Sequence, residues 1–400
     1  MNVGIVVDNE LNNDVRVLRE IRILKEEGFN IFVLCFDFRK IYKDPVSGIY
    51  ITRIRIHRKL KDILFFFLNT ISLYEWFWSI KIKKHILKNN LEVLHAHDLY
   101  MACAAHSGIK KSGKKIPLIL DLHENYPFTV TTYNWTKGLL RRFFSRPDTW
   151  KKKEREYLGY ADKIVVLSDE YRGSLLQEYP DLSEDSFTVF PNVPDISSPE
   201  YINKTVVKKP FTNRQPVMLY YGVIAERRGI LEALSVFSEL VKEGRKVNLL
   251  LIGPVDKKDH KHFKEMISTV HFKGNLIHIP WINSADFPGY LEFADICLAP
   301  FRKNPQHESG IANKIYDYMH GGKPLIVSDC GPQKNLVEKY NCGLAFSNNR
   351  EFKDAIVRLL EDESMRRSMG NNGRNAIINF YNVAVYRENI LTVYRKPASG

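Results

Sequence analysis

Short apolar runs alternate with helical stretches along the whole chain, and this alternation constrains the fold more than any other feature of the sequence. Runs of this length are typical of strands buried in parallel sheets that carry helices on both faces. The sequence therefore predicts an α/β protein with two doubly wound sheets. The ten runs are Gly4–Val7, Ile31–Phe36, Val93–Ala96, Leu118–Leu122, Ile164–Leu167, Leu219–Tyr221, Leu249–Ile252, Leu276–Ile279, Ile296–Ala299 and Leu325–Val327.

A polar, Pro-rich stretch between Pro191 and Pro216 divides the chain into two domains. Four hundred residues exceed what one hydrophobic core usually supports. PNVPDISSPE and KTVVKKPFTNRQP carry several prolines and no regular apolar spacing, which is typical of a linker. We therefore expect a Rossmann-like domain at residues 1–195, a linker at 196–215 and a second Rossmann-like domain at 216–376. Residues 377–394 have the spacing of a final amphipathic helix.

The start of the chain and its cysteines indicate the compartment. The first apolar run begins almost at Met1, without the charged segment and cleavable apolar segment of a secretory signal. The five cysteines are scattered and never form Cys-x-x-Cys, so we expect neither a disulfide framework nor a zinc site. These features predict a cytoplasmic protein.

The positive charge of the chain is unevenly distributed. The formal net charge is +13, and residues 51–155 hold 21 Lys and Arg against 8 Asp and Glu, a surplus of 13. A localised basic surface indicates an anionic partner such as a membrane face, a phosphorylated lipid or nucleic acid. None of the usual nucleic-acid-binding modules is present in the sequence, so we do not expect nucleic acid as a partner.

The segment from Arg53 to Lys88 interleaves basic residues with bulky apolar ones. Its apolar part, residues 63–80, is long enough to cross a bilayer, but polar residues and a Glu within it argue against a transmembrane helix. Basic flanks and internal tryptophans are typical of a segment that lies at a membrane surface. The alternative is a helix packed on its own sheet, and both interpretations stay open.

Residues 307–329, HESGIANKIYDYMHGGKPLIVSD, predict a short helix followed by a buried strand. Ile311 to His320 has helical spacing. The Gly321-Gly322 pair ends this helix, as glycine past a helix C-terminus does. The loop before the helix is therefore placed at the edge of a sheet.

The same stretch predicts an anion site. Ser309 and Gly310 lie just before the first expected turn, where free N–H groups and the helix dipole attract negative charge. Lys314 adds a full positive charge on the polar helix face, beside Asn313. Asp317, one turn further along, is an acceptor suited to ribose hydroxyls.

Asp14 and Arg16 lie in the loop and helix start that follow the first expected strand. The carboxyl ends of strands in a doubly wound sheet are where ligands bind. Both residues are therefore site candidates, although an N-capping Asp and a solvated Arg explain the pattern equally well.

Two further expected strands of the first domain end in polar side chains. His95-Ala96-His97-Asp98 ends one, and Asp121-Leu122-His123-Glu124 ends the other. The two histidines of His-x-His lie on one side of a strand, but the sequence offers no evident third ligand, so we expect no metal. We interpret these side chains as hydrogen-bonding groups of a crevice.

The second domain opens with the same arrangement of strand, glycine turn and helix. Gly222 follows the strand, and a helix is expected to begin near Gly229. Arg228 lies directly before that helix start, where an anion is favoured. A helix-start arginine without ligand explains the residue equally well.

Residues 312–329, ANKIYDYMHGGKPLIVSD, resemble the donor-site segment of retaining glycosyltransferases of family four, which have the GT-B fold. That family has a Glu-x7-Glu pattern whose carboxylates close on the ribose. The second carboxylate corresponds to Asp317, and the first to Ser309, so Glu308 is the substitute for it. The resemblance also implies a last helix, within residues 377–400, that crosses back to the first domain.

The resemblance extends to other strand ends. GVIAERRG resembles the family pattern G-R-L-x-x-x-K-G, with Arg228 at its second basic position and Val223 in place of the first, so Lys314 compensates. His123 corresponds to the histidine that contacts the transferred sugar. The implied catalytic residues are Arg228, Lys314 and His123; the donor-binding residues are Gly222, Glu308, Ser309, Gly310, Ile311, Asn313 and Asp317; the acceptor-side residues are Asp14, Arg16, His97, Asp98 and Glu124.

The resemblance implies transfer of a sugar from a nucleotide-diphosphate sugar to a glycan or lipid-linked acceptor, with retention of anomeric configuration. The sequence contains no Asp-x-Asp, so we expect neither a metal ion nor another cofactor. Localisation would be cytoplasmic, with peripheral contact to an anionic membrane. A nucleotide-sugar 2-epimerase of similar fold, and a non-catalytic binder of sugar or nucleic acid, are the alternatives.

Overall fold

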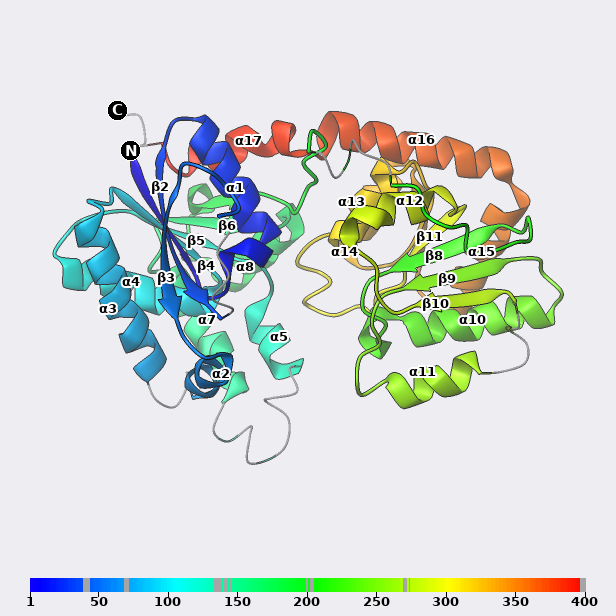
Figure 1. The fold of residues 1–400 in the computed structure, drawn as a ribbon, viewed down its shortest axis with the longest axis horizontal. Helices are drawn as coiled ribbons and strands as arrows, with labels where there is room; N and C mark the ends of the chain where they lie inside the picture. Colours follow the sequence, from blue (N-terminus) through cyan, green and yellow to red (C-terminus); the bar gives the residue numbers. More distant parts are fainter. Residues whose placement is uncertain are drawn as a thin grey trace. The chain divides into compact units, whose positions relative to one another are not determined.

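The computed structural model describes residues 1–38, 44–67, 72–132, 139, 143, 146–198, 201, 205–268, 272 and 274–395. The chain forms two compact units, each built around one parallel sheet (Figure 1). Unit 1 comprises residues 1–191 and 386–400, and unit 2 comprises residues 192–385. The predicted α/β class with two doubly wound sheets is confirmed.

Unit 1 contains a seven-stranded sheet in the order β3-β2-β1-β4-β5-β6-β7. All of its neighbouring strands are parallel. The strands are β1 (Asn2–Val7), β2 (Asn30–Asp37), β3 (Tyr50–Arg55), β4 (Val93–His97), β5 (Leu118–Asp121), β6 (Lys163–Val166) and β7 (Phe187–Val189). The helices are α1 (Val15–Glu26), α2 (Arg58–Phe66), α3 (Leu73–Lys88), α4 (Ala102–Ser112), α5 (Tyr126–Thr132), α7 (Trp150–Leu158) and α8 (Asp169–Glu178). Helix α17 (Val383–Thr392) begins in unit 2 and continues into unit 1 from Tyr386.

Helices α3, α4 and α7 cover one face of this sheet, and α1 covers the other (Figure 1). The strands offer alternate apolar side chains to the first face, among them Val6 and Leu120. Trp78 of α3 and Trp150 of α7 are fully buried against that face. Burial of such large side chains is the main stabilising term for the unit.

Unit 2 contains a six-stranded parallel sheet in the order β10-β9-β8-β11-β12-β13. The strands are β8 (Val217–Tyr221), β9 (Asn248–Ile252), β10 (Leu276–Ile279), β11 (Ile296–Ala299), β12 (Leu325–Ser328) and β13 (Gly343–Phe346). The helices are α10 (Ile230–Lys242), α11 (His260–Ile267), α12 (Phe287–Glu292), α13 (Asn313–His320), α14 (Gly331–Tyr340), α15 (Asn349–Glu361) and α16 (Glu363–Phe380). Helices α10, α11 and α15 share one core face of the sheet.

Each sheet has one point at which the order of its strands reverses. In unit 1 the order reverses between β1 and β4, and in unit 2 it reverses between β8 and β11. Ligands of doubly wound sheets bind beyond the carboxyl ends of the strands at such a reversal. The predicted His97 is the last residue of β4, and Asp98 and Gly222 directly follow β4 and β8.

All ten predicted strands are present within one or two residues, and three further strands were missed. These are β3, β7 and β13, which all lie at a sheet edge or next to one. Edge strands have one open side and carry fewer apolar residues, as in the partly exposed YITRIR of β3. Part of the segment that was interpreted as helix from Arg53 onward is therefore strand.

The predicted single helix over residues 377–394 is wrong. Helix α16 ends at Phe380 and α17 begins at Val383. Asn382 causes the break, because its amide donates to the carbonyl oxygens of Ile377 and Ile378 while its Oδ1 accepts from Val385 N. Residues 386–395 pack with unit 1, where Arg387 pairs with Glu26 and Glu27 at the end of α1.

Replacing Asn382 tests this joint. Asn382→Ala removes three hydrogen bonds from a buried side chain, so we expect the free energy of unfolding to fall by about 1–2 kcal/mol. Asn379→Ala is the matched control, because Asn379 is exposed and its amide bonds only within its own helix. Equal urea midpoints for the two variants would contradict the proposed role of Asn382.

Candidate functional site

Arg228 and Lys314 come together at the carboxyl end of the sheet of unit 2. Lys314 Nζ lies 3.8 Å from the ring centroid of Tyr220 and 5.3 Å from that of Phe301. The guanidinium carbon of Arg228 also lies 5.3 Å from the Phe301 centroid. Two cations from different helix starts thus share one aromatic wall, which the sequence did not predict.

Glycines create the space for these cations. A Cβ at Gly222 would lie 2.7 Å from Lys314 Nζ, and φ at this position is 131°. At Gly229 a Cβ would meet the carbonyl oxygen of Pro300 at 1.6 Å. A side chain at either position would therefore push the loop away from the cations.

No carboxylate of the described residues forms an ion pair with either of these cations. Within the same residues, Arg228 Nε is buried without a hydrogen-bond partner. Burial, followed by the charge of Arg228, lowers the pKa of Lys314 well below its usual range. Burial also lowers the pKa of Arg228. Such a pair is stabilised by an anion that reaches both groups.

Asp317 already has a partner in this structure. Its Oδ1 accepts a hydrogen bond from Tyr201 OH at 2.6 Å, and the Tyr201 ring also contacts His320. The carboxylate that was predicted to bind ribose hydroxyls is therefore an acceptor for a hydroxyl. Tyr201 was not predicted, because nothing in the linker sequence connects it to a residue more than 100 positions away.

Ser309, Gly310 and Ile311 do not lie at the helix start, which corrects the prediction. Helix α13 begins at Asn313, after an extended Ala312. Ser309 is buried and its hydroxyl donates to Gln306 O at 2.8 Å, inside a turn. The turn forms because Asn304 Oδ1 accepts from two backbone N–H groups, those of residues 306 and 307.

Glu308, the substitute for the first carboxylate, contacts a different helix. Both of its carboxylate oxygens lie 3.2 Å from Gly331 N, at the first residue of α14. Negative charge at a helix N-terminus is stabilising, so this contact explains the residue structurally. Asn313 is exposed at the first position of α13, on the polar face that also carries Asp317.

In unit 1, Arg16 is buried and ion-paired, so the alternative interpretation of a solvated Arg is wrong. Its Nε and Nη2 donate to the two oxygens of Asp121 at 2.7 and 2.8 Å. Its Nη1 donates to Phe190 O at 2.8 Å. Asp14 Oδ1 accepts from Val17 N at 3.1 Å and so caps α1, in agreement with the interpretation of Asp14 as an N-capping residue. Arg16 therefore positions the sheet end and is not exposed to a ligand.

The two histidines of β4 stack on one side of the strand, as strand alternation predicted. Their ring centroids are 4.4 Å apart. His95 Nδ1 hydrogen-bonds the hydroxyl of Tyr394, which follows α17. The Glu20 carboxylate lies 3.7 Å from His95 and 3.8 Å from His97. Burial raises the pKa of Glu20 well above its usual range, and Asp121 adds to the increase.

His123 links this buried cluster to the crevice. Its Nε2 lies 2.9 Å from His97 Nδ1, and its Nδ1 lies 3.8 Å from Asp98. Burial lowers the pKa of His123, but Asp98 and Asp121 outweigh burial and raise the pKa to about 10. A protonated His123 donates to His97 Nδ1, so neutral His97 carries its proton on Nε2, toward Glu20.

Four buried side chains place potential metal ligands close together. The ligand atoms of Glu20, His95, His97 and Asp121 all lie within 4.8 Å of one another. The expectation that His-x-His has no further ligand nearby is therefore wrong. The cluster nevertheless fits a metal poorly, because both oxygens of Asp121 already accept from the Arg16 guanidinium, whose positive charge would repel a cation.

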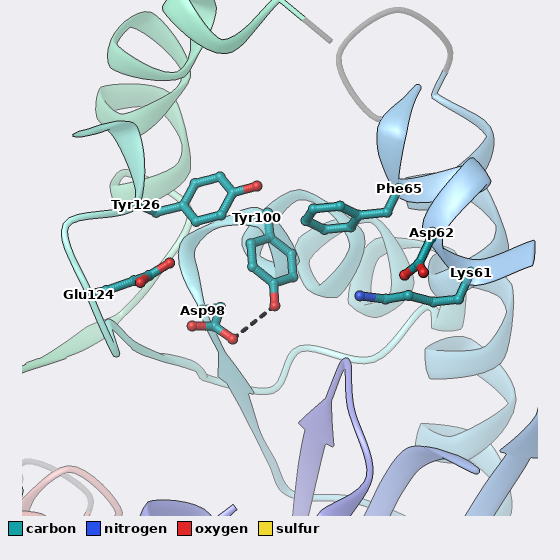
Figure 2. Close-up of a pocket in the computed structure, with 7 residues that line it drawn as sticks. All are labelled: Lys61, Asp62, Phe65, Asp98, Tyr100, Glu124 and Tyr126. Carbon is teal, nitrogen blue, oxygen red and sulfur yellow. Dashed lines mark hydrogen bonds between the residues drawn. The ribbon is translucent and has the colours of Figure 1, made fainter. Parts of the chain in front are cut away.

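A cavity of about 310 Å³ opens in unit 1 beside Asp98 and Glu124 (Figure 2). Its other lining residues were not predicted as site residues from the sequence. The available signal was that Tyr100 and Tyr126 follow HAHD and DLHE within three residues, at the same strand ends. The remaining lining residues, from α2, are Lys61, Asp62 and Phe65.

The basic segment from Arg53 to Lys88 divides into β3, α2 and α3. Trp78 of α3 is fully buried on the sheet, so the packed-helix interpretation holds for α3. Trp76 and Leu73 of the same helix are more than half exposed, as is Ile63 of α2. Within the described residues, no helix is both long and apolar enough to cross a membrane.

Two protein-family models match the chain, one on each part. The model "Glycosyltransferase Family 4" matches residues 14–198, and "Glycosyl transferases group 1" matches residues 202–376. Together the two matches leave only the ends and a few residues between them uncovered.

Known proteins resemble the chain at low identity. The alpha-D-kanosaminyltransferase of Streptomyces kanamyceticus is 23% identical over 184 residues, which are 46% of each chain, so the match spans about half of that relative. The sucrose-phosphate synthase from Thermosynechococcus elongatus has a TM-score of 0.74 at 15% identity, covering 99% of this chain and 98% of the other. An E. coli structure described as "Trehalose-6-phosphate … bound with UDP-2-fluoro glucose" has a TM-score of 0.72 at 11% identity, with complete coverage of both chains.

The charge state of His123 is directly testable. NMR titration of the imidazole signals should show His123 protonated at neutral pH and losing its proton near pH 10, whereas His85, whose pKa burial lowers, should titrate below 6.5. Because the folded-state pKa is raised, the stabilisation is complete below pH 6.5 and is lost as the pH rises toward 10. Asp98→Asn should lower the pKa of His123; titration of wild-type His123 at or below 6.5 would refute the assignment.

Proposed function

Because this chain is a glycosyltransferase with the GT-B fold, we propose that it transfers a sugar from a nucleotide-diphosphate sugar with retention of anomeric configuration. The donor would bind in unit 2 at the loops after β8 and β11. The acceptor would bind in unit 1 beside His123 and Asp98. The acceptor class that we propose is a glycan or a lipid-linked precursor of a cell-surface glycan.

The observation that supports the donor assignment is a pair of cations that form no ion pair within the described part of the chain. Arg228 and Lys314 approach one aromatic wall from two helix starts, and no described carboxylate pairs with either. A diphosphate supplies two adjacent negative groups, which suits two cations from different directions. That the E. coli structure is described as bound with UDP-2-fluoro glucose supports this class of donor.

In the proposed reaction the anomeric C–O bond to the diphosphate breaks while the acceptor oxygen bonds to the same carbon. The acceptor hydroxyl proton passes to a phosphate oxygen of the leaving group, so no protein nucleophile is assigned. Negative charge grows on the diphosphate as the bond breaks. Arg228 and Lys314, already in place, stabilise that charge without reorganisation.

Asp317 would select the ribose. Its carboxylate accepts the Tyr201 hydroxyl at 2.6 Å, and a ribose hydroxyl is a chemically similar donor. Donor binding would therefore exchange one hydroxyl for another at Asp317, and Asn313 on the same helix face would lie beside it. Glu308 remains a weaker candidate because Gly331 N occupies both of its oxygens.

A membrane-bound acceptor is proposed from the charge and apolar exposure of α2 and α3. Exposed Leu60, Ile63, Leu73 and Trp76 accompany the lysines of this segment. Basic residues near an anionic surface each contribute about 1 kcal/mol, and exposed apolar groups add to the attraction. We propose peripheral association with the cytoplasmic face of an anionic membrane.

Alanine variants of the two cations test the proposed chemistry. Lys314→Ala and Arg228→Ala should each lower single-turnover rates at saturating donor by about 100-fold, the effect of removing one preorganised donor. The double variant should lose less than the product of the two effects, because both groups serve one charge. The measurement requires a donor and an acceptor that support turnover.

Arg227→Ala is the matched control. Arg227 adjoins Arg228 but is exposed and lies 3.8 Å from Asp256, so its loss should leave the rate within about twofold of wild type. A wild-type rate for either Lys314→Ala or Arg228→Ala would exclude that residue from leaving-group stabilisation. Donor binding without turnover on any acceptor would favour a non-catalytic binder.

Vesicle co-sedimentation tests membrane association. Binding should rise with the fraction of anionic lipid and fall with salt, because surface charges are screened. Lys59→Glu with Lys84→Glu should weaken it about 10-fold or more, whereas Lys257→Glu with Lys258→Glu, the same charge change in unit 2, should not. Equal binding to neutral vesicles, or none to anionic ones, would contradict the proposal.

A further inference from the structure

The cavity of unit 1 has an aromatic interior and an acidic rim. Figure 2 shows the rings of Tyr126, Tyr100 and Phe65 in a row, with the charged side chains along one side of it. Glu124 and Asp98 lie toward the Tyr126 end, and Asp62 and Lys61 toward the Phe65 end. The Tyr100 centroid lies 5.0 Å from that of Phe65 and 4.9 Å from that of Tyr126. The volume of the cavity, about 310 Å³, is at the lower end of the range for small-molecule pockets, about 300–1,000 Å³.

The aromatic row is held rigidly. Tyr126 is buried, and its ring contacts the buried Trp150 edge-on at 4.6 Å. Tyr100 is fixed at its other end because its hydroxyl donates to Asp98 Oδ2 at 2.9 Å. Phe65 of α2 meets the Tyr100 ring edge-on, so α2 closes the cavity with an aromatic side chain. A rigid aromatic wall favours a flat, partly apolar ligand face.

Asp98 is placed in the cavity at an energetic cost. Its backbone has φ 72° and ψ 141°, a conformation that residues other than glycine rarely adopt and that costs about 1–3 kcal/mol. The surrounding structure holds it there, since its N–H donates to Asp121 O at 2.8 Å. As a result, its carboxylate lies between the Tyr100 hydroxyl and the His123 ring.

The charge of the cavity selects against anions. Three carboxylates, those of Asp62, Asp98 and Glu124, line it with one ammonium group, that of Lys61. Lys61 is also committed elsewhere, because its Nζ lies 3.4 Å from buried Asp8 and 4.5 Å from the Phe65 ring centroid. A phosphate or carboxylate on the ligand would therefore meet repulsion here, in contrast to the cations of unit 2.

We propose that this cavity binds the end of a saccharide that carries hydroxyl or amino groups and no phosphate or carboxylate. The C–H face of the sugar ring packs on Phe65 and Tyr100, and its hydroxyl or ammonium groups donate to Asp98 and Asp62. The inference rests on the proposed function, since the bound saccharide end is the acceptor of the transfer. It adds the chemical class of that end and the residues that select it.

Ligand-observed saturation-transfer NMR on the full chain tests the inference without turnover, with excess inorganic pyrophosphate present to occupy Arg228 and Lys314 of unit 2. The probes are methyl α-glucoside, methyl α-galactoside, glucosamine and glucose 6-phosphate at equal millimolar concentrations. We expect transfer to at least one of the first three and none above background to the phosphate. Phe65→Ala should weaken that binding about 5- to 10-fold, the scale of one lost aromatic contact. Phe380→Ala, which removes an exposed aromatic side chain from α16, is the control.

A charge reversal gives a second, positive readout. Asp62 is exposed on α2, so Asp62→Lys should preserve the fold while it weakens glucosamine binding and allows glucose 6-phosphate to bind. Equal binding of phosphorylated and unphosphorylated sugars to wild type, no binding of any probe, or no effect of Phe65→Ala would each overturn the inference. None of these binding outcomes bears on the single-turnover rates of Lys314→Ala and Arg228→Ala. Conversely, wild-type rates in those two variants would refute the proposed role of the cations in transfer and would leave saccharide binding in unit 1 intact.

Discussion

The buried ion pair between Arg16 and Asp121 is the interaction on which the crevice of unit 1 depends. It joins the first turn of α1 to the end of β5 through two short hydrogen bonds. With Asp121 held ionised by Arg16, the carboxylate orients His97 and His123. Removal of either partner would leave an uncompensated buried charge, which costs several kcal/mol. The position of His123, and with it that of Asp98, therefore follows from a contact between residues 105 positions apart.

The sequence predicts what depends on local pattern. Apolar runs identified ten strands, and strand alternation placed His95 and His97 on one side of β4. Predictions from local pattern fail where the conformation of a residue depends on a hydrogen-bond or ion-pair partner that the local sequence does not show. The sequence left Arg16 as either a site residue or a solvated side chain, because its contact with Asp121 does not show in the local pattern. The helix 377–394 looked continuous because Asn382 could equally have been a solvated side chain. In both cases a distant or backbone partner satisfies the polar group and changes the structure.

In the candidate donor site too, local pattern predicted some features, and contacts between distant residues decided the others. Lys314 and Arg228 were predicted separately from two helix starts, and both lie there. That they share the wall formed by Tyr220 and Phe301 could not be predicted, because these aromatic residues appear in the sequence as ordinary apolar members of β8 and of the loop after β11. Ser309 does not lie at the expected helix start, because the turn at Asn304 fixes its position.

The lowered pKa of Lys314 has a consequence for the proposed reaction. Burial and the neighbouring Arg228 disfavour the charged amine in the empty site. A diphosphate reverses this balance, because negative charge near an amine raises its pKa. Donor binding and uptake of a proton by Lys314 are thereby linked, so the affinity for the donor falls as the pH rises through the range in which the empty-site amine loses its proton. In the empty site the two cations repel each other, and the folded structure holds them together against this repulsion. When charge develops on the leaving diphosphate, the same two cations stabilise it.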